Sequence, residues 1–274
     1  NNFKFIEGDI CDLNICNDGL KNIDFVLHHA ARGSVTKSIE DPIKTNNSNI
    51  TGFLNLLMAG QRSGIKKFIY ASSSSVYGDD KTLPKKEDKI GKQLSPYAIT
   101  KYANELYARN ISELYGLKTI GLRYFNVFGR RQDPFGDYAA VIPKWIEKLN
   151  NQEEIEIFGD GETSRDFCYI DNVIQINLLA ALNDINNNSE IYNVACNSKM
   201  SLNQLAENIM GILKEDENIS YNFKKIIHKE FRKGDIRHSL ADISKAKNDL
   251  AYDPSFSAYE GLKIYIKWYL QTQK

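Results

Sequence analysis

The sequence predicts an α/β fold built around a parallel sheet. Three short apolar runs each end in small or polar residues, at Asp24–Ala31, Lys66–Ser75 and Lys118–Asn126. Segments with apolar residues at helical spacing lie between them, at Asn49–Ser63 and Tyr97–Tyr115. Continuous apolar runs are typical of buried parallel strands, and strands that alternate with helices pair in parallel through right-handed crossovers.

The rest of the chain predicts more elements of the same kind and a second lobe. The segment Lys4–Ile10 is expected to add a strand at the front of the sheet. After Asn126 a loop rich in Gly, Arg and Asp leads to a helix at Ala140–Asn150 and a short strand at Glu154–Phe158. A strand, a helix and a strand follow, and a helical region begins at Ser201. We expect one lobe from residues 1–127 and 166–197, and a smaller one from residues 128–165 and 198–274.

Composition excludes several classes of protein. The 274 residues include 35 basic and 35 acidic side chains, so no excess positive charge would attract a nucleic acid. No apolar stretch approaches the ~18 residues of a membrane span, which predicts no membrane partner. The four cysteines have neither metal-ligand nor disulfide-framework spacing, so we predict no metal site and a cytoplasmic location.

Small or polar residues follow several of the predicted strands at their carboxyl ends. Ser72–Ser75 follow one strand, Ala30 and Ala31 another, and Tyr124–Asn126 a third. Ligands of parallel sheets bind beyond these ends, so the residues are expected to meet in one crevice.

Tyr97 and Lys101 form a candidate acid–base pair. Ser95 and Pro96 make a favourable helix start, which places the two side chains one turn apart on one face. A neighbouring ammonium favours the phenolate, so Lys101 is expected to lower the pKa of Tyr97 from about 10 toward the range of a general base.

Several longer motifs now identify a resemblance. They occur in one order along nearly the whole chain: GDI at Gly8, HHAA at His28, NITG at Asn49, SSSSVYG at Ser72, SPYAITK at Ser95, LRYFNVFGRRQDP at Leu122, AAVIPKW at Ala139, GDGETSRDFCYIDNV at Gly159 and FRKGDIRHS at Phe231. The chain resembles the extended short-chain dehydrogenases/reductases of the nucleotide-sugar branch, and among the UDP-hexose 4-epimerases it is most similar to UDP-N-acetylglucosamine 4-epimerases.

The resemblance implies a Rossmann-like sheet, NAD as cofactor and inversion of sugar carbon 4 through a 4-keto intermediate. Tyr97 would take the proton of the 4-hydroxyl group, Ser73 would hydrogen-bond the same oxygen, and Lys101 would hold the nicotinamide ribose. The substrates implied are UDP-N-acetylglucosamine and UDP-N-acetylgalactosamine, with UDP-glucose and UDP-galactose as a further pair. The resemblance also implies a homodimer formed through helices 49–63 and 97–115.

The same resemblance assigns binding residues. Those expected around the cofactor, besides Tyr97 and Lys101, are Asp9, Ile10, His29, Ala30, Ala31, Asn49, Tyr124 and Phe125. Those expected around the UDP-sugar are Gly33, Ser34, Ser74, Ser75, Asn126, Ala140, Val141, Arg165, Arg232, Asp235 and Ser239. Ser239 takes the place of a bulky residue in relatives restricted to plain hexoses, which predicts room for a 2-acetamido group.

Three alternatives remain beside this prediction. Another enzyme of the same family, a uronic acid epimerase or a decarboxylase, would share most of the motifs, and so would an inactive nucleotide-sugar-binding fragment. None of the 17 glycines falls in the GxxGxxG pattern with which the family begins. We therefore expect that about the first two strand–helix units of the fold are missing and that the cofactor site is incomplete.

Overall fold

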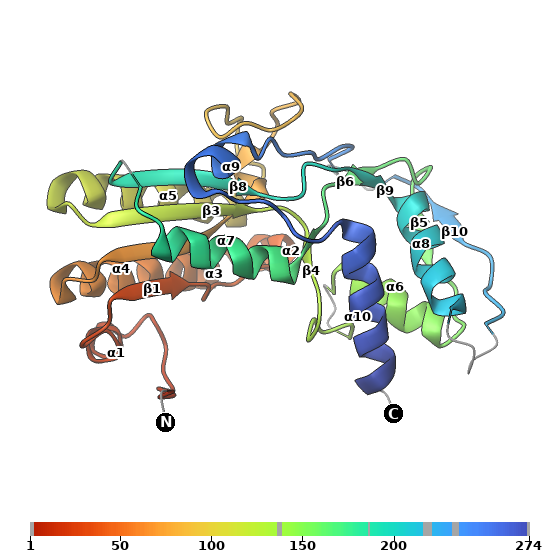
Figure 1. Ribbon diagram of the computed structural model, residues 1–274, viewed down its shortest axis with the longest axis horizontal. Helices are drawn as coiled ribbons and strands as arrows, with labels where there is room; N and C mark the ends of the chain where they lie inside the picture. The colour runs from red at the N-terminus through yellow and green to blue at the C-terminus, as the bar shows by residue number, and fades with distance from the viewer. Residues whose placement is uncertain (1–2, 136–138, 186, 216–220, 232–235, 273–274) are drawn as a thin grey trace.

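A computed structural model of the chain describes residues 3–135, 139–185, 187–215, 221–231 and 236–272, and it has two lobes (Figure 1). The larger lobe is built on a four-stranded sheet in the order β1-β2-β3-β8. Its strands are all parallel: β1 (Phe25–His28), β2 (Lys67–Ser73), β3 (Lys118–Tyr124) and β8 (Ser189–Val194). The predicted parallel α/β fold is confirmed.

Helices cover both faces of this sheet (Figure 1). On one face α4 (Gly52–Ser63) and α5 (Pro96–Tyr115) pack with β1 and β2 around the buried ring of Phe53. On the other face α7 (Ile170–Leu182) and α9 (Ser244–Leu250) pack with β3 and β8 around Leu122. The sheet is thus buried from both sides, which explains why its strands have continuous apolar runs.

The predicted helix at Asn49–Ser63 begins earlier than expected. It follows α2 (Val35–Glu40) and runs through α3 (Pro42–Asn46) and the π-helical turn η1 (Asn47–Thr51) into α4 without a break. Asp41 caps it, because its Oδ1 accepts from the N–H of Lys44, and Pro42 occupies the first position. The π turn places the buried Asn49 side chain toward the carboxyl edge of the sheet.

The predicted strand at Lys4–Ile10 is wrong. This segment is irregular and leads into the short helix α1 (Leu13–Gly19), and Phe5 is 75% exposed. A strand needs a hydrogen-bonded neighbour, and in the described chain the segment pairs with none.

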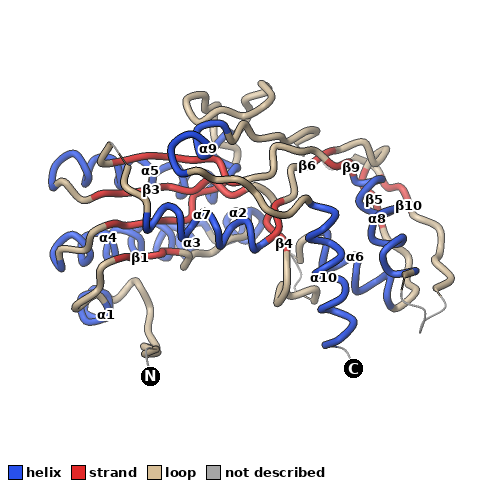
Figure 2. The backbone as a smooth tube through the Cα atoms, in the orientation of Figure 1, coloured by secondary structure: helices blue, strands red, loops and turns tan. Residues whose placement is uncertain are grey.

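The smaller lobe combines helices with short strand pairs (Figure 2). Its helices are α6 (Val141–Asn150), α8 (Leu202–Lys214) and α10 (Ala258–Thr272). They enclose a separate core in which Trp145, Ile209 and Tyr265 are buried. Among the described residues its short strands pair as β5 (Glu156–Phe158) with β10 (Ile227–Lys229), and β6 (Ser164–Arg165) with β9 (Met200–Ser201). The pair of β4 (Val127–Phe128) with β7 (Cys168–Tyr169) lies where the lobes join, because Cys168 is buried in the core of the larger lobe and Tyr169 in that of the smaller lobe.

The stretch that precedes α10 departs from the predicted lobe division. Ala241, Ile243, Leu250 and Tyr252 fall within residues 198–274, yet they are buried in the core of the larger lobe. Their apolar side chains cover the face of the sheet beside β8, so the chain returns to the larger lobe before α10. Among the described helices none is long and apolar enough to cross a membrane.

Candidate functional site

The carboxyl ends of the parallel strands meet at one edge of the sheet. The register pairs Ser73 with Tyr124 and Tyr124 with Val194, so the ends of β2, β3 and β8 are level. His28 ends β1 and pairs with Tyr70, three residues before Ser73. The polar residues that follow these strands therefore meet at this edge, as predicted.

The serine run continues from β2 into a 3₁₀ turn, η2 (Ser74–Tyr77). The Ser73 hydroxyl oxygen accepts a hydrogen bond from the N–H of Ser75 at 3.1 Å, which fixes the start of the turn. The Ser75 hydroxyl is buried and finds no partner among the described residues. A buried hydroxyl without a partner is costly, so it suits a site that a polar ligand completes.

The structure brings Tyr97 and Lys101 to the same edge through the start of α5. Ser95 caps this helix by accepting from the N–H of Ala98, and the N–H of Tyr97 donates to Ser38 Oγ on α2. The Lys101 ammonium lies 5.9 Å from the centroid of the Tyr97 ring. It donates a hydrogen bond to the carbonyl oxygen of Ala71 at 2.7 Å, which links the first turns of α5 to β2.

Burial controls the proton affinities of this pair. It raises the pKa of Tyr97, and a hydrogen bond with the Ser73 hydroxyl lowers that pKa by less. Burial also lowers the pKa of Lys101 to about 8, because the charged ammonium loses its hydration. The expectation that Lys101 lowers the pKa of Tyr97 is therefore wrong for this structure.

A polar network extends from β1 to α7 beside the pair. His29 stacks on Tyr124 with ring planes 7° apart, and its Nε2 lies 3.0 Å from the Tyr124 hydroxyl. The Asn177 amide donates to the same hydroxyl at 2.8 Å. Burial lowers the pKa of His29 and raises that of Tyr124, so both rings are neutral near pH 7. The network fixes the Tyr124 ring at the end of β3.

The other residues predicted around a cofactor differ in exposure. Asn49 is buried, and its side chain bonds the N–H and carbonyl groups of Arg32 and the Thr100 hydroxyl. Ala30, Ala31 and Asp9 are exposed, and Ile10 is half-buried. Phe125 is fully buried with its ring 5.9 Å from that of Tyr77, so its side chain belongs to the core.

A cavity of about 1070 Å³ opens beside this edge and extends into the smaller lobe. Five of the residues predicted around a UDP-sugar line it: Gly33, Ser34, Asn126, Val141 and Arg165. The amide of Asn126 donates to the carbonyl oxygen of Asp166 at 3.2 Å, which fixes the turn after β3. Arg165 donates to the carbonyl oxygen of its neighbour Ser164 at 3.0 Å.

The remaining predicted substrate residues are not among the described residues that line the cavity. Ala140 is the exposed residue that precedes α6, Ser74 and Ser75 lie in η2, and Ser239 is half-buried. The Ser239 N–H donates to the carbonyl oxygen of Ser164 at 3.0 Å, so Ser239 lies next to Arg165. Arg232 and Asp235 lie outside the described residues.

Sequence reasoning missed several lining residues. Lys144 and Lys148 line the cavity from α6, and Glu156 and Phe158 line it from β5. The two lysines are four residues apart, which predicts a common helix face. That signal shows which residues share a face but not that the face borders a cavity, because the neighbouring β5 is distant in the sequence.

A buried ion pair packs beside β2, the strand that carries Ser72 and Ser73. Arg123 on β3 donates to both carboxylate oxygens of Glu105 on α5, at 2.9 and 2.8 Å, and both side chains are at most 2% exposed. The Ser72 hydroxyl donates to the same carboxylate at 2.5 Å. The pair therefore joins β2, β3 and α5 directly behind Ser73.

Comparison with known proteins gives consistent matches. The profile of the NAD dependent epimerase/dehydratase family matches residues 1–195. A UDP-glucuronate 4-epimerase of Thermodesulfobacterium geofontis is 36% identical over 270 residues, which cover 97% of this chain and 79% of the relative.

Solved structures agree with these sequence matches. A UDP-N-acetylglucosamine 4-epimerase of Methanobrevibacter ruminantium, solved in complex with UDP-N-acetylmuramic acid, has a TM-score of 0.89 at 40% identity and covers 97% of this chain and 83% of its own. A UDP-glucose 4-epimerase of Thermotoga maritima with UDP-glucose has a TM-score of 0.91 at 37% identity and covers 100% of this chain and 86% of its own.

Proposed function

This chain belongs to the NAD dependent epimerase/dehydratase family, and from that premise we propose that it interconverts UDP-N-acetylglucosamine and UDP-N-acetylgalactosamine by NAD-dependent 4-epimerisation. One observation carries the proposal: Ser73, Tyr97 and Lys101 lie together at the carboxyl edge of the sheet. None of the three is among the described residues that line the cavity, but Gly33, Ser34 and Asn126, which follow strands that end at the same edge, do line it. Solved relatives with nucleotide sugars bound support the substrate class.

The residues at this edge fit the nicotinamide end of NAD. Lys101 is 3% exposed, and the described residues supply one acceptor, the Ala71 carbonyl oxygen, for its three N–H groups. Ribose hydroxyls could accept from the others, so Tyr97 and Lys101 would hold the nicotinamide ribose, with Tyr124 beside the ring. Bound NAD supplies the reversible hydride acceptor that carbon 4 chemistry needs.

The protein side of the chemistry is transfer of a proton at the 4-hydroxyl group. The Tyr97 phenol oxygen would take that proton as general base and return it as general acid. The Ser73 hydroxyl would donate a hydrogen bond to the same sugar oxygen when carbon 4 carries a carbonyl group. Burial keeps water from this oxygen, which strengthens both interactions.

The cavity offers suitable groups for the rest of the substrate. Arg165 and Asn126 would contact the diphosphate, because a guanidinium fork and an amide both donate to phosphate oxygens. Gly33 and Ser34 would border the sugar. Ser239 would leave room for the acetamido group, which favours the acetylated substrates over UDP-glucose and UDP-glucuronate.

We also propose that the chain forms a homodimer through residues 49–63 and 97–115. Ile99, Leu106 and Leu114 lie in the second of these segments and are 54%, 45% and 65% exposed. A row of exposed apolar side chains along a helix is typical of an interface between copies. The four cysteines are unpaired, which supports the cytoplasmic location that we propose.

Proton NMR of the chain with NAD and one nucleotide sugar tests the proposal. We expect UDP-N-acetylglucosamine to give the galacto epimer, and UDP-glucose to react more slowly. Turnover of UDP-glucuronate alone would contradict the proposed substrate and favour the uronic acid epimerase. Calorimetric binding of UDP with no turnover of any sugar would instead indicate a binding module.

A further inference from the structure

The segment Arg237–Asp242, here called the strap, lies between the two lobes and carries Ser239. On one side the N–H of Ser164 donates to the Arg237 carbonyl oxygen, and the N–H of Ser239 donates back to Ser164, both at 3.0 Å. On the other side Lys85 accepts from the N–H of Asp242 at 2.9 Å and donates to the Leu240 carbonyl oxygen at 2.7 Å. Backbone hydrogen bonds on both sides thus fix the position of Ser239.

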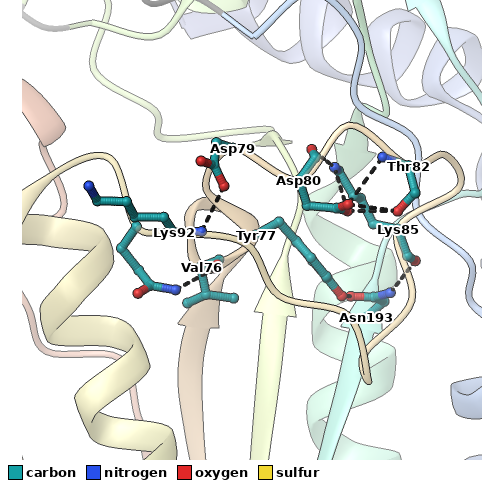
Figure 3. Close-up of polar contacts among 9 residues, drawn as sticks. Val76, Tyr77, Asp79, Asp80, Thr82, Lys85, Lys92 and Asn193 are labelled. Carbon is teal, nitrogen blue, oxygen red and sulfur yellow. Dashed lines mark hydrogen bonds and ion pairs between the residues drawn. The ribbon is translucent and has the colours of Figure 1, made fainter.

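Lys85 belongs to a long loop, Gly78–Leu94, whose own contacts hold it in place (Figure 3). At the base of the loop Asp79 accepts from the N–H of Lys92 at 2.7 Å, and Gln93 donates to the Val76 carbonyl oxygen at 3.1 Å. Within the loop the Lys85 ammonium pairs with the Asp80 carboxylate at 2.9 Å. The strap therefore rests on an ordered loop.

Asn193 on β8 is hydrogen-bonded to this loop, to the strap and to the turn η2. Its amide nitrogen donates to the carbonyl oxygens of Lys85 and Asp242, both at 2.9 Å. Its amide oxygen accepts from the Tyr77 hydroxyl at 2.6 Å, and Tyr77 is the last residue of η2 (Figure 3). Both N–H groups of the amide therefore donate to carbonyl oxygens, one in the Gly78–Leu94 loop and one in the strap.

The location of Asn193 excludes a direct role on the substrate. The residue is 0% exposed, and it is not among the described residues that line the cavity. Its connections nevertheless end at two parts of the proposed site. Through Tyr77 it reaches the turn that begins after Ser73, and through Asp242 it reaches the strap three residues from Ser239.

We propose that Asn193 is a positioning residue that sets selectivity for the substituent at sugar carbon 2. By holding the strap against the Gly78–Leu94 loop, it would keep Ser239 far enough from sugar carbon 2 to admit a 2-acetamido group. This inference rests on the proposed function, because it assumes that Ser239 borders that group. It assigns no contact with substrate or cofactor to Asn193 itself.

The substitution Asn193→Asp removes the hydrogen bonds that the amide donates to Lys85 and Asp242 and keeps the one that it accepts from Tyr77. Aspartate has the same shape and can still accept from Tyr77, but an oxygen replaces the nitrogen that donates to Lys85 and Asp242. The strap and the Gly78–Leu94 loop then each lose one hydrogen bond, while η2 keeps its own. Tyr77→Phe is the matched control, since it removes one buried hydrogen bond of the same amide and leaves the strap bonds intact.

Calorimetry with UDP, UDP-glucose and UDP-N-acetylglucosamine reports the effect without turnover. In Asn193→Asp we expect the Kd of UDP-N-acetylglucosamine to rise about tenfold relative to that of UDP-glucose, the effect expected for two lost hydrogen bonds. The Kd of UDP should change less than about twofold. In Tyr77→Phe the ratio of the two sugar affinities should equal that of the wild type.

Equal weakening of both sugars in Asn193→Asp, or the same change of ratio in Tyr77→Phe, would overturn the inference. Thermal unfolding checks that each variant folds. If the aspartate variant does not fold, Asn193→Ala replaces it: alanine removes both donors and also the acceptor of the Tyr77 hydroxyl, and Tyr77→Phe then measures the effect of losing the Tyr77 bond alone. A wild-type chain that binds both sugars but turns over neither refutes the proposed function and still allows this test. A wild-type chain that binds neither sugar refutes both.

Discussion

The ammonium group of Lys101 lies 5.9 Å from the centre of the Tyr97 ring, and its one hydrogen bond to a described residue goes to the carbonyl oxygen of Ala71, not to the phenol. Ser73 is the residue whose hydroxyl group hydrogen-bonds Tyr97 and lowers its pKa. Lys101 therefore fixes the helix that carries Tyr97, whereas Ser73 and burial control the affinity of the phenol for its proton.

Replacement of the phenol tests the proton-transfer role. Tyr97→Phe should lower kcat for UDP-N-acetylglucosamine by about 10²- to 10⁴-fold, the usual contribution of a general acid–base group. The Kd of the substrate should change little, because the ring remains. Tyr107→Phe is the control on the same helix, where the side chain is 41% exposed. A kcat within tenfold of the wild type in Tyr97→Phe would refute the assignment.

Replacement of Ser239 tests the substrate preference. Ser239→Tyr places a bulky ring where we expect the acetamido group, so turnover of UDP-N-acetylglucosamine should fall selectively while UDP-glucose is still converted. Comparison of kcat/KM for the two sugars measures the effect. An equal loss for both sugars would refute the assignment of Ser239.

The carboxyl group of Asp166 gives a prediction about pH. It accepts hydrogen bonds from the N–H groups of Cys196 at 2.9 Å and Ala241 at 3.2 Å, and burial raises its pKa from 3.8 to about 6. Between these values the folded protein holds the proton more tightly than the unfolded chain. The contribution of Asp166 to the free energy of unfolding is therefore largest below pH 3.8 and falls by about 3 kcal/mol as the pH rises through 6.

Urea unfolding at several pH values measures this contribution. The difference in unfolding free energy between the wild type and Asp166→Asn isolates it, because asparagine does not titrate. We expect that difference to shift against the wild type between pH 4.5 and pH 7. Parallel pH dependences of the two proteins would show that the carboxyl group titrates at its ordinary pKa.

The sequence predicts which residues follow each strand better than it predicts which buried polar residues hydrogen-bond the backbone around them. Ser73, Tyr97 and Tyr124 were predicted at one edge because strand order and helix starts leave local signals. Asn193 and Asp166 were not predicted, because their partners are mainly backbone groups of segments that are distant in the sequence. Side-chain type alone carries no information about such partners.

Two errors have physical causes of the same kind. The segment Lys4–Ile10 has the composition of a strand, but a strand forms only where another strand offers hydrogen bonds. Tyr97 and Lys101 have the spacing of a coupled pair, yet burial of the phenol outweighs the influence of a charge that is itself buried and bonded elsewhere. A local sequence pattern predicts where a residue lies along a helix or strand, whereas its burial depends on the whole fold.

Substitution on the exposed face of α5 tests the proposed dimer. Ile99→Glu puts a charge on the proposed apolar interface, so the protein should change from twice the chain mass to 31.2 kDa in analytical ultracentrifugation. Leu178→Glu is the control, since Leu178 is 51% exposed on α7, which covers the opposite face of the sheet. Dissociation caused by the control variant alone would place the interface on the α7 face instead.

The ion pair between Glu105 and Arg123 predicts a stability cost that a second substitution can recover. Arg123→Met leaves the Glu105 carboxylate buried without its cation, which should cost about 3–5 kcal/mol in urea unfolding. Adding Glu105→Leu removes the unpaired charge and should restore most of that loss. The recovery should be incomplete, because the Ser72 hydroxyl then loses its acceptor. A double variant no more stable than Arg123→Met would show that the cost comes from packing around the arginine and not from the unpaired charge.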